Sequence, residues 1–193
     1  WLGNDALLVT GNEAEDADLD PIESEIYRVD LSSAAVTPLT RRDGPDFAPK
    51  IAPNGARIAY LGYDDELRSY QQNNVYLMAS DGGGARNLTV NYDRSVDNIA
   101  WRSDGKALIG QVEDEGILTL VSIDLSGNVR TLVEDIGGTS LGRPYAAGSF
   151  SVASNAGGSS PIIAYTKGST NRPAEVAINR GGRDGRQLTR LND

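Results

Sequence analysis

The chain has no histidine and no cysteine among its 193 residues. Without cysteine it can form no disulfide, no thiolate metal site and no cysteine nucleophile. Without histidine it lacks the usual general base of hydrolases and the commonest zinc ligand. We therefore expect no catalytic activity from this chain alone, and we predict no catalytic residue, no metal site and no cofactor in it.

Long apolar runs and positive charge are also scarce. The longest apolar runs, such as residues 6–9 and 161–165, fall far short of the ~20 residues that a membrane helix needs. The chain has 18 Lys and Arg against 27 Asp and Glu, a net charge of −9, whereas nucleic-acid binding needs clustered cations. The sequence therefore predicts no membrane span and no nucleic-acid partner.

Because the first residue is Trp1, we interpret the chain as a piece of a longer protein, whose compartment the N-terminus does not indicate.

An internal repeat organises the whole sequence. Similar segments begin at residues 1, 51, 101 and 152, so the period is close to fifty residues, and the clearest copies are 1–9 and 101–109. Two further elements recur in the same order. The second is found at 25–30, 74–78, 118–124 and 175–179, and the third at 38–40, 87–89, 130–132 and 187–189. Constant order at a near-constant period predicts four structurally similar units.

Each repeated element is short and rich in Ile, Val, Leu, Tyr and Thr, which is typical of β-strands. Asn54-Gly55 and Asp104-Gly105 are typical of hairpin turns. Each unit is thus predicted to be a meander of four strands, A to D. Such units at this period are the blades of a β-propeller. We predict an all-β propeller arc of about four blades of four-stranded antiparallel sheets, with blades at about 1–50, 51–100, 101–151 and 152–193, the first lacking strand A.

The repeats resemble a known family. Residues 101–106 (WRSDGK) and 51–55 (IAPNG) resemble the W-S-P-D-G-K signature of TolB-type (PD40) propellers. Residues 174–176 and 182–193 resemble the stretch near the propeller's end in the acylaminoacyl-peptidase branch of the prolyl oligopeptidase family. That resemblance implies a non-catalytic propeller that gates and positions peptide substrates for an α/β-hydrolase domain of the same protein. It also favours a cytoplasmic location. The alternative is a TolB-like scaffold that binds a protein partner.

Two motifs favour a structural interpretation. Residues 138–142 fit G-x-S-x-G, but Pro144 disfavours the helix that a nucleophile elbow needs, and no histidine exists to activate Ser140. We interpret this segment as a loop. The acidic run at 13–20 matches no calcium-loop spacing, so we interpret it as a solvated loop between strands B and C.

Five arginines are the candidate functional residues. By the up-and-down order of the strands, the B–C loops and the D–A connections lie on one face of a propeller. In the peptidase interpretation the hydrolase domain covers this face, where the arginines would contact that domain or a peptide carboxylate. The alternative is that they are ordinary surface arginines. They are Arg41, Arg42, Arg94, Arg143 and Arg190.

Overall fold

In a computed structural model of the chain, the described residues are 1–138, 148–153, 160–169, 171–181 and 185–192. They form fifteen strands joined by turns and loops. Nothing in this described part is a helix long and apolar enough to cross a membrane. The chain divides into two compact units, unit 1 (residues 1–91) and unit 2 (residues 92–193), which are described separately below.

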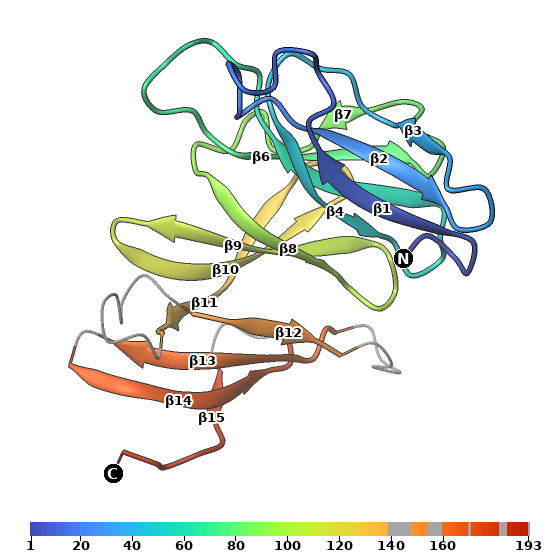
Figure 1. The fold of residues 1–193 in the computed structure, drawn as a ribbon. Coiled ribbons are helices and arrows are strands. Elements are labelled where there is room, and N and C mark those ends of the chain that lie inside the picture. The colour runs from blue at the N-terminus through green and yellow to red at the C-terminus, as the bar shows by residue number, and fades with distance from the viewer. Residues whose placement is uncertain (139–147, 154–159, 170, 182–184, 193) are drawn as a thin grey trace. The chain divides into compact units, whose positions relative to one another are not determined.

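Unit 1 contains two antiparallel meanders in which consecutive strands pair (Figure 1). The first consists of β1 (Ala6–Gly11), β2 (Glu25–Asp30) and β3 (Val36–Pro38). The second consists of β4 (Asp46–Ile51), β5 (Arg57–Gly62), β6 (Asn74–Ala79) and β7 (Arg86–Asn87). The first sheet has three strands, as predicted for a blade without strand A.

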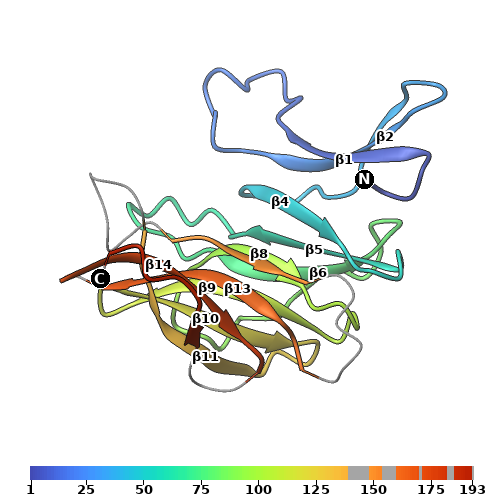
Figure 2. The same ribbon diagram turned by 90° about the horizontal axis from the view of Figure 1, so that it is seen from below.

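The two sheets of unit 1 pack face to face, and β4 lies against β1 and β2 (Figure 2). The core between them includes Ile26 of β2, Ile58 of β5 and Met78 of β6, all at most 1% exposed. Tyr60 and Tyr76 stack beside them with ring centroids 5.3 Å apart. Both tyrosines are therefore core residues.

Unit 2 contains two further meanders. The first consists of β8 (Val96–Trp101), β9 (Ala107–Asp114), β10 (Ile117–Asp124) and β11 (Val129–Ile136). The second consists of β12 (Phe150–Val152), β13 (Ile163–Ser169), β14 (Arg172–Asn179) and β15 (Arg186–Gln187). One antiparallel residue pair, Ile136 with Lys167, joins β11 to β13, so the two meanders share one continuous sheet.

The fold class predicted from the repeats is confirmed: the described chain is all-β and is built from antiparallel meanders of three or four strands. The predicted hairpin turns are present, because Gly55 (φ 72°) and Gly105 (φ 65°) both adopt the left-handed conformation that glycine favours. The structure divides the chain into two compact units, so the four blade limits stay a prediction.

Candidate functional site

A repeated threonine explains the third element of the repeat. The hydroxyl of Thr40 accepts a hydrogen bond from the backbone N–H of Ile26 at 2.9 Å. The hydroxyl of Thr89 accepts the same bond from the backbone N–H of Val75 at 2.9 Å, and that of Thr189 from the backbone N–H of Val176 at 2.8 Å. Each threonine thereby satisfies a backbone donor of strand C of its own meander. The threonine of this element therefore has a structural role in each meander.

Arg42, one of the five predicted arginines, is held inside unit 1. It lies in the connection between β3 and β4, and its Nη2 contacts Asp46 Oδ1 at 2.5 Å. Its Nη1 pairs with Asp64 and donates to the hydroxyl of Tyr76 at 3.0 Å. The guanidinium also lies 4.2 Å from the centroid of the Tyr76 ring. Arg42 therefore ties a D–A connection to the first residue of β4 and to the next B–C loop.

The charges around Arg42 are poorly solvated. The side chain of Asp46 is fully buried and that of Arg42 is 22% exposed. Burial raises the pKa of Asp46, and the ion pair with Arg42 offsets this only in part. Burial also raises the pKa of Glu25, against a hydrogen bond from Thr40. For Arg42, burial would lower the pKa, but the interactions with Asp46, Tyr76 and Asp64 together outweigh it, so the pKa rises and Arg42 remains a cation.

Arg94 makes the corresponding contact in unit 2. It lies in the connection before β8, and its Nε pairs with Asp114 Oδ1 at 2.6 Å. This hydrogen bond raises the pKa of Arg94. The pair is much more open to solvent than the one in unit 1, because the two side chains are 39% and 48% exposed. Arg94 thus joins a D–A connection to the end of strand B at low electrostatic gain.

A third ion pair repeats this arrangement with the charges exchanged. Asp135, near the end of β11, contacts Lys167 of β13 through Oδ2 and Nζ at 2.6 Å. The hydroxyl of Tyr165 donates to the other carboxylate oxygen of Asp135 at 3.0 Å. We call the three ion pairs the clasps: Arg42–Asp64, Arg94–Asp114 and Lys167–Asp135.

Sequence reasoning found the arginines of two clasps but not their partners. Asp64 and Asp114 lie fifty residues apart, which is the period of the repeat, so comparison of equivalent loops could have identified both. No such signal marks Asp135 and Lys167, because their charges are reversed with respect to the other clasps.

The remaining predicted arginines differ in their surroundings. Arg41 is exposed in unit 1, and Arg190 is exposed after β15 in unit 2. Arg143 lies outside the described residues, as does Ser140 of the G-x-S-x-G motif. The structure thus gives Arg42 and Arg94 carboxylate partners, and the proposed role of all five at a domain interface or in substrate access stays a prediction.

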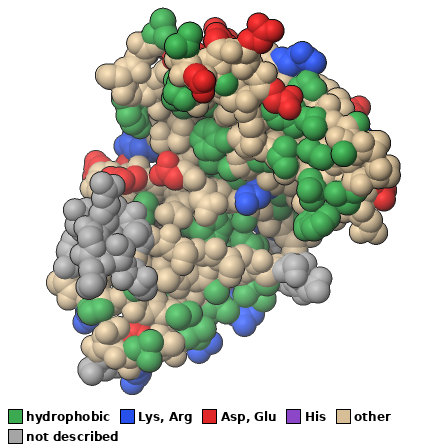
Figure 3. Space-filling view, viewed as in Figure 1, with side chains coloured by type: hydrophobic (Ala, Val, Ile, Leu, Met, Phe, Trp, Pro, Cys, Tyr) green, Lys and Arg blue, Asp and Glu red, His purple; other side chains and the backbone are tan. Residues whose placement is uncertain are grey.

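The acidic run at 13–20 forms a loop closed by hydrogen bonds. Asn12 donates to the backbone oxygen of Asp20 at 2.9 Å, and the backbone oxygen of Asp16 accepts from Leu19 at 2.7 Å. Acidic side chains gather over unit 1 at the top of Figure 3. In the part of the chain that the structure describes, no group of three acidic side chains is arranged to hold a metal ion.

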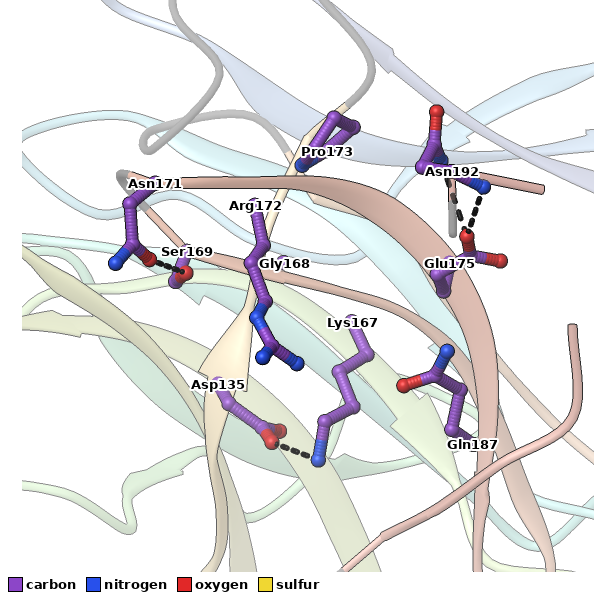
Figure 4. A pocket seen from close by; sticks show the side chains of 10 residues that line it. All are labelled: Asp135, Lys167, Gly168, Ser169, Asn171, Arg172, Pro173, Glu175, Gln187 and Asn192. Atoms are coloured by element: carbon purple, nitrogen blue, oxygen red, sulfur yellow. Dashed lines mark hydrogen bonds and ion pairs between the residues drawn. The ribbon is translucent and has the colours of Figure 1, made fainter. Parts of the chain in front are cut away.

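Unit 2 contains a polar hollow of about 420 Å³. It lies where the end of β11 meets the β13–β14 hairpin, beside β15 and the tail that follows (Figure 4). Its charged and amide side chains are Asp135, Lys167, Arg172, Glu175, Gln187 and Asn192. A hollow of this size accommodates a ligand as large as a short peptide. The sequence carries no signal for this hollow, since its residues come from separate strands of two meanders.

Comparison with known proteins finds sequence similarity to peptidases and structural similarity to β-propellers. No protein-family model matches the chain. It is 35% identical over 79 residues to a probable dipeptidyl-peptidase 5 of Aspergillus clavatus, covering 39% of this chain and 11% of that protein. It is 26% identical over 176 residues to dipeptidyl-peptidase 5 of Arthroderma otae, covering 83% of this chain and 22% of that protein.

Two solved structures show the propeller fold. The chain matches the β-propeller domain of the trilobed protease from Pyrococcus furiosus with a TM-score of 0.65 and 18% identity, covering 100% of this chain and 51% of that one. It matches TolB from Acinetobacter baumannii with a TM-score of 0.61 and 18% identity, covering 100% and 43%. At these identities the likeness shows the fold alone. The chain spans about a fifth or less of the length of the two curated relatives.

Proposed function

We propose that this chain, a β-propeller segment of the peptidase type, gates and positions peptide substrates for a serine-type hydrolase domain of the same protein. The observation that carries the proposal is the match to dipeptidyl-peptidase 5 of Arthroderma otae, which extends over 83% of this chain. The chain has no histidine, so a histidine general base would have to come from another part of the protein. The contribution of the propeller is then exclusion and orientation of substrate.

The clasps support this role. Two of them, Arg42–Asp64 and Arg94–Asp114, fix a D–A connection to the end of strand B or to the B–C loop that follows, and the third joins the end of strand D to strand B of the next meander. In a propeller the D–A connections and the B–C loops lie on one face. A face that limits substrate access has to hold its loops in place, because loops without internal contacts open at little cost in free energy. Ion pairs that join these loops to the neighbouring strands provide such a restraint.

The test uses the intact protein. We expect a fluorophosphonate probe to label a single serine outside this chain, and we expect hydrolysis of dipeptidyl nitroanilides that the probe abolishes. The 193-residue chain alone should neither be labelled nor hydrolyse these substrates above the buffer rate. An intact protein that the probe does not label would contradict the proposal.

A TolB-like scaffold is the second candidate. It is favoured by the match to TolB from Acinetobacter baumannii, which extends over the whole of this chain. In that case the face with the D–A connections and B–C loops would bind a protein partner. An intact protein that lacks a fluorophosphonate-reactive serine but forms a stable complex through this face would favour the scaffold.

A further inference from the structure

We propose that the polar hollow of unit 2 binds a carboxylate group of a peptide ligand, with Arg172 as the main contact. The peptide nature of the ligand rests on the proposed function, but the carboxylate chemistry rests on the hollow alone. The argument depends on which charged groups of the hollow already have partners and which do not.

Both acidic side chains of the hollow are already engaged. Asp135 receives Lys167 on one oxygen and the hydroxyl of Tyr165 on the other. Glu175 accepts hydrogen bonds from the hydroxyl of Thr189, and from the backbone N–H and side-chain amide of Asn192 at 2.8 and 3.1 Å. Neither carboxylate therefore needs a cationic ligand.

The cationic side chains have donors to spare. Within the described residues, Arg172 makes no ion pair, and its guanidinium is turned toward the Asp135–Lys167 pair (Figure 4). Lys167 uses one of its three donors on Asp135. An anion placed between Arg172 and Lys167 could accept two parallel N–H hydrogen bonds from the guanidinium and one from the ammonium group. That geometry suits the two oxygens of a carboxylate.

The charge balance favours a singly charged anion. Two cations and two carboxylates line the hollow, so a doubly charged phosphate would be repelled by Asp135 and Glu175 more strongly than a carboxylate. Unit 2 as a whole does not oppose an anion. It carries 12 acidic and 11 basic residues, whereas unit 1 carries 15 and 7.

Beside the hollow, the backbone that follows β11 approaches the backbone of β13 closely. A Cβ on Gly137 would lie 2.5 Å from the Cα of Gly168, closer than side chains tolerate. These glycines let β11 reach the edge of β13, where Ile136 pairs with Lys167. Asp135 and Lys167 are therefore held side by side by the pairing of β11 with β13, and Arg172 is placed by its pairing with Ser169 at the start of β14.

The experiment is calorimetric titration of the full chain with four probes. They are N-acetyl-Ala-Ala as the free acid, the same dipeptide as its amide, N-acetyl-Ala-Glu-amide, and inorganic phosphate. We expect the free acid to bind about tenfold or more tightly than the amide, since a charge-assisted pair is lost. The glutamyl amide carries its carboxylate on a side chain and not at the C-terminus. If it binds as tightly as the free acid, the hollow accepts a carboxylate from either position. If it binds more weakly, the hollow prefers the C-terminal carboxylate.

Two variants test the assignment to Arg172. Arg172→Ala should weaken binding of the free acid about tenfold or more, and Arg172→Lys should restore part of it. The matched control is Arg180→Ala, because Arg180 is also exposed but lies just beyond the opposite end of β14. All variants should keep the thermal midpoint of the native chain, since Arg172 is exposed and makes no described ion pair.

The proposal is overturned if the acid and the amide bind equally, if phosphate binds more tightly than the acid, or if Arg172→Ala binds like Arg180→Ala. Because the assay requires no hydrolysis, a negative result leaves the proposed peptidase role intact. A protein without peptidase activity whose chain still prefers the free acid would instead refute only the proposed function.

Discussion

Replacement of Arg42 by alanine should destabilise unit 1 strongly. The change removes the cation that contacts Asp46, whose side chain is fully buried, and leaves that carboxylate without its ion pair. It also removes the stacking of the guanidinium on Tyr76. Loss of one partner from a buried ion pair costs about 3–5 kcal/mol, and we expect about 3 kcal/mol because Arg42 is partly exposed.

The assay is urea unfolding followed by far-UV circular dichroism. A loss of about 3 kcal/mol corresponds to a fall of about 1–3 M in the urea midpoint. Arg94→Ala is the matched control, because Arg94 occupies the same place in the repeat but forms a solvent-exposed pair. Arg94→Ala should lose much less free energy of unfolding than Arg42→Ala. Equal losses for Arg42→Ala and Arg94→Ala would refute the argument that burial of the Asp46 carboxylate decides how much Arg42 stabilises the fold.

The same variant should have a characteristic dependence on pH. Without Arg42, the pKa of Asp46 in the folded state rises further above the ordinary value of 3.8. Between the unfolded and folded pKa values the folded state binds more protons, so its stability falls as the pH rises. Arg42→Ala should therefore be closer to wild type at pH 4 than at pH 8, and adding Asp46→Asn should remove that difference. A loss of stability independent of pH would argue that the carboxylate of Asp46 is not the cause.

Three further predictions concern separate parts of the chain. Thr89→Ala should cost about 1–3 kcal/mol by urea unfolding, because it leaves a buried backbone N–H of β6 without an acceptor, whereas Thr89→Ser should be close to wild type. Gly137→Ala should lower the thermal midpoint of unit 2, because its Cβ would collide with Gly168; an unchanged midpoint would mean that β11 and β13 can separate freely. In the intact protein, reversal of Arg41 and Arg190 to Glu should change kcat/KM for peptides and leave the rate of fluorophosphonate labelling unchanged, and no change for any peptide would exclude a role for these two exposed arginines.

The strands could be predicted because the repeat marks them directly. The alternation of turn residues and β-branched residues at a period of about fifty residues placed Gly55 and Gly105 in hairpin turns, where their positive φ angles confirm them. Local sequence carries this information because each meander pairs strands that follow one another in the chain.

The contacts of the site could not be predicted in the same way. Arg42 meets Asp64 across 22 residues, and Asp135 meets Lys167 across 32, with the charges exchanged. Such pairs depend on how a loop approaches the next sheet, and no local pattern encodes that approach. The single residue pair that joins β11 to β13, which shapes the hollow around Arg172, has no signal in the repeat either.

The central claim is that the propeller limits the access of substrates to the hydrolase domain. The ratio of kcat/KM for a short substrate to that for a folded substrate tests this claim most directly. Two substrates of the intact protein are compared, and both begin with the same dipeptide. One is the dipeptidyl nitroanilide, and the other is a stably folded protein of about 100 residues with that dipeptide at its N-terminus. A propeller that excludes folded chains predicts a kcat/KM about tenfold or more lower for the folded substrate, with the difference removed when that substrate is unfolded beforehand. Equal kcat/KM values for the short and the folded substrate would contradict the claim.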